Sequence, residues 1–481
     1  MTSAGASSVL DAVVVGGGPN GLAAAISIAR EGRSVSVLEA AETVGGGARS
    51  DDGRTLPGFV HDVCSAIHPF GRTSPFFAGA DLARYGLRWV EAPAGFAHPL
   101  DGGRAIIVRR DVELTAAQLG RDADAYRRMI GPLVRRFGAL IPDILAPFHI
   151  PLSPVRSLRL AWFGVSGLQP ATWLVRRFRD EDARALFGGA AAHSVLRLSE
   201  SISGAAALVM LGSAHHDGWP FPAGGAGEIS RAMEAELRGL GGTIETGRRI
   251  EALADLPASR VALFDTSPRA LHAIAGTRLA ASYRRALTRF RYGPSVFKLD
   301  LAIEGAIPWQ NAEVGEAGTV HLGGTFEEIV ASEAAATSGE HHPRPFVLLA
   351  QQSVFDRSRA PEGKNAIWAY CHVPHGSTVD SSEAILGQIE RFAPGFRERI
   401  LASRATTPAE LEAYNPNNVG GDMSGGRMDL GQLFTRPAVR LDPYSTPDPR
   451  LFLCSSSTPP GGGIHGMPGF HAARSALRRL R

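Results

Sequence analysis

Residues 11–49 constrain the fold of this chain more than any other segment. The apolar run at residues 12–15 predicts a β-strand, residues 16–21 form a glycine-rich turn, and residues 22–30 have helical composition. Residues 34–38 then predict a second strand. This is the order of a βαβ unit that holds a dinucleotide, so the sequence predicts an α/β fold with a Rossmann-like domain.

The turn has the pattern Gly16-x-Gly18-x-x-Gly21, with Pro19 and Asn20 inside it. Gly16 permits the tight turn, Gly18 lets the backbone approach a pyrophosphate, and Gly21 lets the helix pack closely on the strand. The helix N-terminus offers backbone N–H groups and roughly half a positive charge to the anion. We therefore expect all five residues to form the phosphate-binding part of the site.

An acidic residue, Glu39, follows the second predicted strand. It lies about 20 residues beyond the glycines, where a carboxylate accepts both hydroxyls of an adenosine ribose. A 2′-phosphate would be repelled there, so the expected nucleotide lacks one. A GxGxxG pattern alone is weak, but the strand, helix and acid around it favour dinucleotide binding over a purely structural turn. Ala40 is expected to belong to the same site.

The segment after Glu39 ends in Gly45-Gly46-Gly47-Ala48-Arg49. Here the chain resembles the flavin-dependent amine oxidase and phytoene desaturase superfamily. The closest form is the phytoene dehydrogenase-like branch that includes pyridine nucleotide-disulfide oxidoreductase domain-containing protein 2. In the superfamily a glycine doublet and an arginine that touches the phosphates and ribityl chain follow the ribose acid. The resemblance implies FAD as cofactor, with Gly46, Gly47 and Arg49 in contact with it.

Residues 451–480 resemble the C-terminal flavin motif of the phytoene desaturases. Residues 451–454 predict a buried strand, residues 455–467 a loop, and residues 470–480 a helix. The resemblance implies that the flavin contacts include four residues of this loop, namely Gly462, Gly463, Ile464 and Met467. His465 stands where those desaturases usually carry proline. Two roles stay open for it, a catalytic one facing the flavin and a structural one capping the loop.

A middle segment completes the expected FAD domain. Residues 227–240 predict a helix, residues 243–246 a strand, and the resemblance implies that Ile250 contacts the adenine. Residues 261–264 predict a core strand that leads to Thr266, another expected cofactor contact. The predicted FAD domain is discontinuous, with residues 1–75, 216–275 and 440–481. Residues 76–215 and 276–439 remain for an α+β substrate domain with a helical lid.

The lid lies in residues 141–178, which are rich in Pro, Trp, Phe and Arg. We weigh a segment that lies on a membrane surface against a buried connecting helix pair, and favour the buried pair. Residues 292–303 predict a strand that resembles the amine oxidase strand whose lysine holds a water beside flavin N5. Lys298 is therefore a candidate catalytic residue. The alternative is that Lys298 pairs with a carboxylate.

Composition excludes several classes of protein. A chain of 481 residues with 44% hydrophobic and 20% charged residues suits a two-domain globular enzyme, and no apolar run is long enough to span a membrane. Three scattered cysteines without a CxxC pair exclude disulfide reductase chemistry, and the histidines lack metal-ligand spacing. The arginine runs read as solvated helix faces, so no nucleic acid partner is expected. We expect a cytoplasmic protein, with peripheral membrane contact as an open alternative.

We therefore expect an FAD-dependent oxidoreductase that removes a hydride from a C–H bond of a small, mainly apolar substrate, with oxygen or another acceptor taking the electrons. Desaturation leads, redox-neutral double-bond isomerisation is a close alternative, and amine oxidation ranks third. A non-enzymatic prenyl or lipid carrier, like the Rab dissociation-inhibitor proteins, stays open. The substrate, the acceptor and the oligomeric state do not follow from the sequence. A long apolar cavity beside the flavin would favour desaturation, and a small aromatic cage would favour amines.

Overall fold

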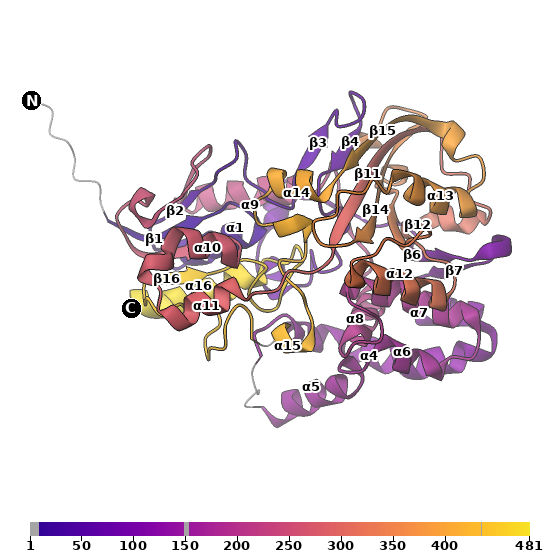
Figure 1. The fold of residues 1–481 in the computed structure, drawn as a ribbon, viewed down its shortest axis with the longest axis horizontal. Helices are drawn as coiled ribbons and strands as arrows, with labels where there is room; N and C mark the ends of the chain where they lie inside the picture. Colours follow the sequence, from indigo (N-terminus) through magenta and orange to yellow (C-terminus); the bar gives the residue numbers. More distant parts are fainter. Residues whose placement is uncertain (1–8, 149–152, 434) are drawn as a thin grey trace, which may run out of the picture.

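A five-stranded parallel sheet forms one half of the molecule, at the left of Figure 1. The computed structural model describes residues 9–148, 153–433 and 435–481. The order of the strands in the sheet is β16 (Leu451–Leu453), β10 (Ser259–Phe264), β1 (Leu10–Val15), β2 (Val35–Leu38) and β9 (Thr243–Glu245). This sheet confirms the predicted α/β class and its Rossmann-like domain.

Helices cover both faces of this parallel sheet, as its apolar strands require. On one face lie α1 (Pro19–Ala29), α9 (Gly227–Gly239) and α16 (Met467–Leu480). On the other face lie α10 (Pro268–Ala275) and α11 (Ala281–Thr288). Every residue of α1 is buried, because α9 and α16 pack against it as well as the sheet.

A seven-stranded mixed sheet forms the second half of the molecule, at the upper right of Figure 1. The order of its strands is β15 (Ile400–Thr406), β11 (Ser295–Glu304), β14 (Lys364–Val373), β13 (Val347–Ala350), β12 (Ala317–Leu322), β6 (Ala94–Pro99) and β7 (Ala105–Val108). The pairs are antiparallel except for β12 with β6. The side chains of β11 alternate between the two faces of the sheet. Phe297, Leu299 and Leu301 pack with α13 (Ser382–Phe392). Val296, Lys298 and Asp300 lie on the opposite face.

A layer of helices lies below this sheet in Figure 1. It consists of α3 (Val112–Ala116), α4 (Ala123–Ile144), α5 (Pro154–Gly167), α6 (Ala171–Leu174), α7 (Glu181–Ala191) and α8 (Ser203–His216), with α12 (Phe326–Ser338) beside α7. Residues 111–137 and 180–216 are mostly helical, but neither range forms one continuous helix. Gly120 breaks the first with φ 50° and ψ −122°, and left-handed backbone at Val195 and Ile202 separates α7 from α8.

The favoured interpretation of residues 141–178 as a buried helix pair is wrong. Gly167 is the one buried residue of α5, whereas Val155, Leu158 and Val165 are each at least 70% exposed. The exposed residues recur at helical spacing on one face of α5. The face that carries Ser157, Leu160, Ala161 and Gly164 lines a cavity, and Val165 lies at its border. Helix α5 therefore lies over that cavity as a lid.

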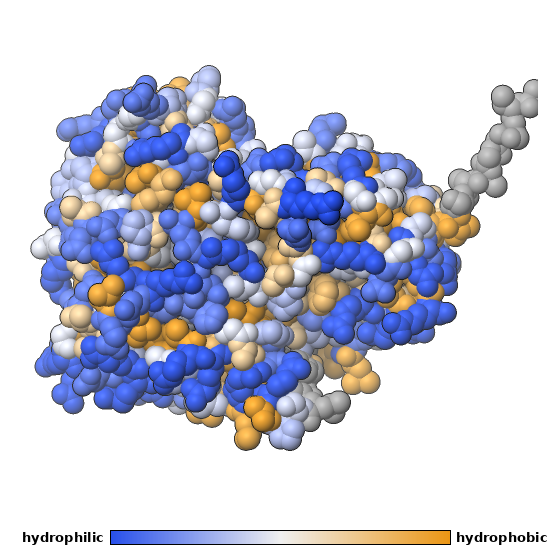
Figure 2. Space-filling view, turned by 180° about the vertical axis from the view of Figure 1, so that it is seen from behind, coloured by the Kyte–Doolittle hydropathy of each residue, from blue (hydrophilic) through white to orange (hydrophobic). Residues whose placement is uncertain are grey.

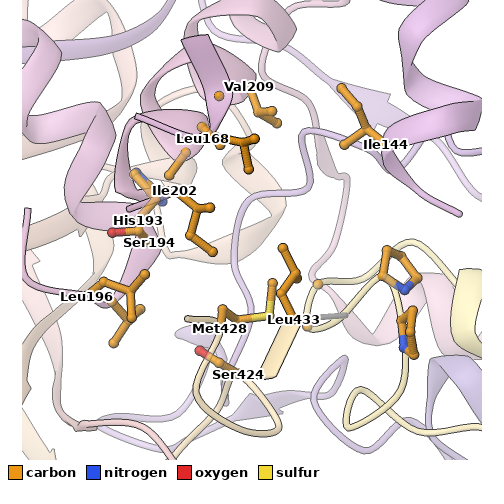
Figure 3. Close-up of a pocket in the computed structure, with 18 of the residues that line it drawn as sticks. Ile144, Leu168, His193, Ser194, Leu196, Ile202, Val209, Ser424, Met428 and Leu433 are labelled. Carbon is orange, nitrogen blue, oxygen red and sulfur yellow. The ribbon is translucent and has the colours of Figure 1, made fainter. Parts of the chain in front are cut away.

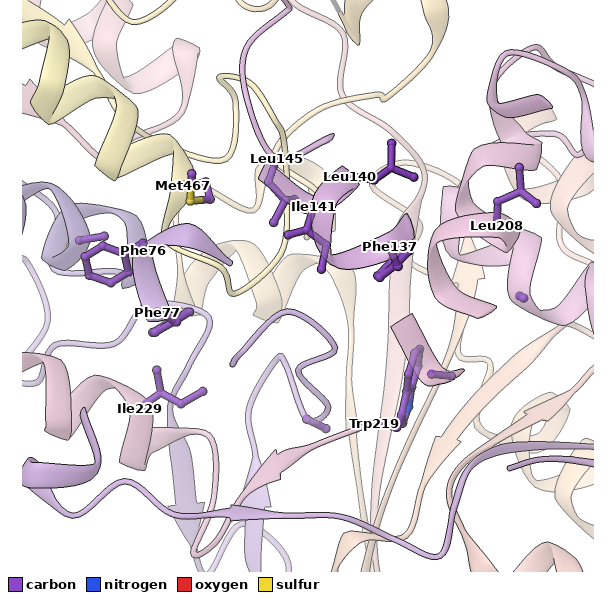
Figure 4. Close-up of a cluster of buried hydrophobic side chains, with 14 of the residues drawn as sticks. Phe76, Phe77, Phe137, Leu140, Ile141, Leu145, Leu208, Trp219, Ile229 and Met467 are labelled. Atoms are coloured by element: carbon purple, nitrogen blue, oxygen red, sulfur yellow. The ribbon is translucent and has the colours of Figure 1, made fainter. Parts of the chain in front are cut away.

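One buried cluster joins the two halves, as Figure 4 shows. Phe76 and Phe77 of α2 (Pro75–Ala78) and Met467 of α16 lie near Leu145 and Ile141 at the end of α4. The cofactor half and the helical layer therefore share a hydrophobic core. The strands of the five-stranded sheet fall within residues 1–75, 216–275 and 440–481, and those of the seven-stranded sheet fall outside them.

The remaining regular elements are short. They are β3 (Ser50–Asp52), β4 (Val60–Asp62), β5 (Trp89–Val90), β8 (Phe221–Pro222), α14 (Pro408–Tyr414) and α15 (Leu430–Leu433). The β5–β8 pair links the two halves through its backbone. No helix in the described ranges has both the length and the apolar composition to cross a membrane.

Candidate active site

A cavity of about 400 Å³ opens at the carboxyl ends of β1, β2 and β10. Ligands of open parallel sheets bind at this edge. The predicted cofactor residues that line it are Gly16, Gly18, Pro19, Asn20, Glu39, Ala40, Gly46, Gly47, Arg49, Ile250, Thr266, Gly463 and Ile464. The structure therefore brings residues from all three predicted segments of the FAD domain to one cavity.

The glycine turn is close-packed, as its predicted roles require. Gly16 has φ 102°, where only glycine is unstrained. A Cβ on Gly21 would lie 2.0 Å from the carbonyl oxygen of Gly16, so any side chain there would force α1 away from β1. Gly21 does not line the cavity, which fits a packing role better than a cofactor contact.

Glu39 is buried at the end of β2 and holds the turn in place. Its Oε2 accepts the N–H of Gly17 at 2.6 Å, and its Oε1 accepts the N–H of Ala41 at 2.8 Å. The guanidinium of Arg49 lies 3.5 Å from the same carboxylate and over the ring of Tyr414. Charge-assisted bonds of this kind fix the carboxylate at the cavity wall.

Asp265 is a site residue that the sequence analysis did not identify. It follows β10, and its Oδ2 accepts the N–H of Gly21 at 2.8 Å. Gly18 caps α1 without a side chain, so Asp265 supplies the capping oxygen from another strand. Burial raises the pKa of the Asp265 carboxyl to about 7, and the nearby charge of Glu39 raises it further while the Gly21 donor opposes the shift. The sequence feature that could have identified Asp265 is an acidic residue directly after a predicted core strand.

An Asn-rich segment at residues 415–418 closes the cavity on the β10 side. The Oδ1 of Asn417 accepts the N–H of Ser267 at 2.8 Å, and its Nδ2 donates to the carbonyl of Asp265 at 3.1 Å. These two bonds fasten the turn between β10 and α10. Asn417 therefore helps to place Asp265 and Thr266.

The polar groups of this cavity fit FAD. The side-chain oxygens of Asn20 and Thr266 are buried at the cavity wall and have no hydrogen-bond partner among the described residues. Buried polar atoms rarely lack a hydrogen-bond partner, so we expect these two oxygens to bond with polar groups of a bound molecule. A Cβ on Gly18 would lie 2.7 Å from Oδ2 of Asp265, so glycine there lets the carboxyl group reach α1. The positive end of α1 opens onto the cavity, where a diphosphate could bind. When bound, FAD supplies a two-electron acceptor.

A second cavity of about 980 Å³ adjoins the first. Met423 and Gly463 line both cavities. Figure 3 shows Leu196, Ile202 and His193 on the helical side, across from Met428. The wall is mainly apolar, and its members include Ile144, Leu160, Phe163, Leu168, Val209, Val296 and Leu433. Gly462, expected as a flavin contact, lines this second cavity rather than the first.

Comparisons with known proteins agree with this geometry. A family model described as an NAD(P)-binding Rossmann-like domain matches residues 14–79. Pyridine nucleotide-disulfide oxidoreductase domain-containing protein 2 of Rattus norvegicus is 24% identical over 98% of this chain and 94% of its own. The phytoene desaturase (neurosporene-forming) of Cereibacter sphaeroides is 22% identical over 95% of this chain and 92% of its own. A structure of putrescine oxidase with putrescine has the same fold, with a TM-score of 0.63 and 15% identity over 98% and 99% of the two chains.

Over nearly its whole length the chain is similar to proteins of the superfamily of FAD-dependent amine oxidases and desaturases. These comparisons support an FAD-dependent oxidoreductase, and the first cavity is the candidate FAD site, called the FAD site below.

In this oxidoreductase, Lys298 is fully buried and pairs with the carboxylate of Asp300. Asp300 also accepts a bond from Arg54 Nε at 2.5 Å, and His61 lies 3.5 Å away. Burial lowers the pKa of the Lys298 ammonium, and the charge of Asp300 opposes that shift. Lys298 lines neither cavity, which favours the carboxylate-pair alternative, and its catalytic role stays a prediction.

His465 and Met467 lie at the start of α16 rather than at a cavity wall. The Nδ1 of His465 accepts the N–H of Met467 at 3.2 Å, and burial lowers the pKa of this imidazole to about 4. This bond makes His465 a cap of the loop, which was the structural alternative for this residue. Met467 is fully buried in the core that joins the two halves.

Proposed function

We propose that the enzyme removes a hydride from a C–H bond of a mainly apolar substrate held in the second cavity, as a desaturase or dehydrogenase does. Oxygen or another acceptor then takes the electrons from the reduced enzyme. One observation carries the proposal: an apolar cavity of about 980 Å³ shares Met423 and Gly463 with the FAD site. A substrate in this cavity lies against the edge of the dinucleotide site.

In such a reaction the protein positions the substrate and excludes water from the reacting atoms. The side chains of the wall hold an apolar chain by burial and exclude water from the reacting carbon. Wall residues come from α5, α8, β11, β14 and the loop at residues 423–433, so closing α5 over the cavity completes the enclosure. This arrangement supports a substrate of the size of a lipid or an isoprenoid rather than a small polar one.

The wall has few aromatic rings. Phe148, Phe163 and Tyr370 are its aromatic members in the described part of the chain. A cage of paired rings, which would favour an amine, is not built from these three residues. The geometry therefore favours the reaction class of the phytoene desaturase relative over that of the putrescine oxidase neighbour.

Anaerobic flavin bleaching tests the proposal. The FAD-bound protein is mixed with phytoene in detergent micelles, or with putrescine, and the visible flavin spectrum is recorded. We expect phytoene to bleach the flavin and putrescine to leave it unchanged. Bleaching by putrescine alone would overturn the proposal, and colourless protein that binds phytoene would support a lipid carrier.

A pair of matched variants ties the reaction to the cavity. Leu168 lines the cavity and is 50% exposed, whereas Leu114 is 56% exposed and lines neither cavity. Leu168→Arg should weaken phytoene binding by roughly tenfold, because a charged group replaces part of the apolar wall. Leu114→Arg should leave binding unchanged.

We also infer that α5 rests on a membrane surface. Its exposed Val155, Leu158 and Trp162 form one apolar stripe, and exposed arginines of α4, among them Arg136 beside the Trp162 ring, flank it. Figure 2 shows apolar side chains along the lower edge of the molecule, where α5 lies in Figure 1. The same helix lines the cavity, so an apolar substrate could pass from lipid to the cavity beneath it.

A further inference from the structure

The apolar cavity has a buried imidazole–carboxylate pair in its wall. His372 lies on β14 and lines the cavity, and Glu333 lies on α12 behind it. The Nδ1 of His372 is 2.9 Å from both carboxylate oxygens of Glu333. Each of the two side chains is 1% exposed. Burying an unpaired charged group this deeply costs free energy, so the contact between the two side chains is part of the structure of the site.

The carboxylate fixes which nitrogen of His372 is a base. A carboxylate only accepts hydrogen bonds, so Nδ1 carries the hydrogen and Nε2 presents a lone pair. Nε2 is buried and has no hydrogen-bond partner among the described residues. His372 lines the cavity, but its side chain is almost completely covered. Because Glu333 occupies Nδ1, Nε2 is the nitrogen left for a ligand, and a ligand from the cavity reaches it when the side chains that cover it move. A buried acceptor without a donor calls for a ligand that brings one.

The pair is also suited to taking up a proton. In a site of low dielectric constant, the carboxylate of Glu333 stabilises the imidazolium that forms when Nε2 is protonated. An acid that orients an imidazole in this way is the arrangement of a general base and its positioning residue. Glu333 acts through His372 and does not itself line the cavity.

The pair lies close to the junction with the FAD site. Val296 of β11 is the cross-strand partner of His372, and both residues line the cavity. Val296 and Met423 pack in one small buried cluster, and Met423 lines both cavities. A substrate atom bound at Nε2 therefore lies near the end of the cavity where the hydride must leave.

The other ionisable groups around the pair are neutral near neutral pH. Burial lowers the pKa of His193 to about 4, and the charge of protonated His372 would lower it further. Burial also raises the pKa of the Cys371 thiol to about 12 and the pKa of the Tyr370 phenol above its usual range. His321, bonded to His193 at 3.0 Å, has a pKa lowered by burial. Among the described groups, Glu333 therefore supplies the charge that His372 experiences.

We propose that His372, positioned by Glu333, binds a hydroxyl group of the substrate and accepts its proton, so that the substrate is a mainly apolar alcohol. This inference rests on the proposed function and narrows its C–H bond to one on the carbon that bears the hydroxyl. In the reaction the O–H proton passes to Nε2 and the carbinol carbon loses a hydride. The former O–H electron pair forms the C=O bond. The alcohol is oxidised to a carbonyl compound, and the FAD gains the two electrons.

Binding of matched ligands tests the hydroxyl site without any turnover. The FAD-bound protein is titrated with 1-dodecanol or with dodecane, by displacement of a lipophilic fluorophore. We expect the alcohol to bind about tenfold more tightly, as a net hydrogen bond to a buried acceptor allows. The preference should disappear in His372→Phe. It should persist in His215→Gln, which changes a buried histidine that lines neither cavity. Equal binding of the two ligands to the native protein would overturn the proposal.

Glu333→Gln tests the positioning role and keeps the size of the pair if His372→Phe does not fold. Nitrogen NMR of the ¹⁵N-histidine-labelled protein reports which ring nitrogen of His372 carries the proton. We expect the proton on Nδ1 in the native protein and a mixture of tautomers in the Gln variant. A merely structural Glu333 would leave the tautomer unchanged, and that result would contradict its role.

Anaerobic bleaching separates this inference from the proposed function. Flavin reduction by 1-dodecanol that slows in deuterated solvent and is lost in His372→Phe supports both. Reduction by dodecane that is equally fast in the native protein and in His372→Phe overturns the inference and leaves the proposed function standing. A His372-dependent preference for the alcohol without any flavin reduction supports the hydroxyl site and contradicts the proposed function.

Discussion

Two carboxyl groups lie beside the positive end of α1 at the FAD site, and they differ in their surroundings. Both are buried, but Glu39 accepts two backbone N–H groups, whereas Asp265 accepts one. The diphosphate of FAD repels a charged Asp265 but not a neutral one. The protonation of this single residue is therefore coupled to cofactor retention.

FAD affinity should fall as the pH rises through about 7. Burial raises the pKa of Asp265 from its ordinary value of 3.8 to about 7, so the folded state favours the neutral carboxyl. The stability that this group contributes is present at low pH and is lost as the pH rises through that folded-state value. We expect FAD to bind roughly tenfold more weakly at about pH 8 than at about pH 6.

Asp265→Asn keeps an oxygen for the Gly21 N–H and removes the ionisation. Its FAD dissociation constant, measured by flavin fluorescence, should be nearly independent of pH over this range. Asp255→Asn, at an exposed carboxylate that also accepts backbone N–H groups, is the control and should behave as the native protein. An unchanged pH dependence in Asp265→Asn would contradict the assignment.

Lys298 offers a second test at the residue scale, because its two roles predict different losses. Lys298→Met leaves Asp300 with Arg54 as partner, so the free energy of unfolding should fall by roughly 1–3 kcal/mol. A catalytic lysine would in addition slow reoxidation of the reduced flavin by oxygen by about tenfold or more. Lys364→Met changes the other lysine of the chain, which is partly exposed, and serves as control. Native reoxidation rates in a destabilised Lys298→Met would leave only the structural role.

At the scale of elements, the contact between α1 and α16 closes the FAD site. A Cβ on Gly469 of α16 would lie 1.8 Å from the backbone oxygen of Asn20, so the helices touch through their backbones. The local pattern predicted both helices, since turn glycines and apolar spacing are properties of neighbouring residues. It did not predict their contact, which depends on the absence of a side chain at Gly469.

Gly469→Ala should therefore lower FAD content in the purified protein, because α16 must move away from α1. Gly387→Ala in α13 is the matched control, since no atom lies within 4 Å of the added Cβ. There the change should raise stability by about 0.5–1 kcal/mol through helix propensity. Flavin absorbance per protein and the thermal melting temperature measure both outcomes. Full FAD content in Gly469→Ala would mean that the two helices need not touch.

The lid helix gives the second prediction at this scale. Replacing Val155 and Leu158, which are exposed and do not line the cavity, by Glu should weaken binding to vesicles of phosphatidylcholine and phosphatidylserine by roughly tenfold per site. Cosedimentation with the vesicles measures the loss. Leu401→Glu, at another exposed leucine on β15, should bind as the native protein does. Equal binding of the double variant would show that the membrane does not contact α5.

At the scale of the whole molecule, the FAD site and the substrate cavity differ in how far the sequence could predict them. The glycine turn, Glu39 and the C-terminal loop carry local patterns with a physical meaning, and they placed the first cavity. The second cavity has no such pattern, because its wall combines side chains from helices, strands and loops far apart in the chain. His372 and Glu333 are 39 residues apart, and the sequence around each of them has no pattern that predicts the pair.

FAD should stabilise the whole molecule rather than one segment. The cofactor contacts all three parts of its domain, and that domain shares a core with the helical layer. At a free concentration of about 100 times Kd, binding adds roughly 2.7 kcal/mol to the free energy of unfolding. Removal of FAD should lower the melting temperature of a single transition that fluorescence and circular dichroism both report. Two separate transitions would show that the halves unfold independently.

The bond between Asn20 and Ser456 joins residues 436 positions apart, and both residues line the FAD site. On the ribosome, residues 10–38 emerge long before their partner strand β16 and helix α16 are made. A nascent chain thus has the phosphate-binding turn but no site able to retain FAD. Cofactor capture must therefore follow synthesis of residues 451–480, and until then α1 is an apolar helix that needs protection from aggregation.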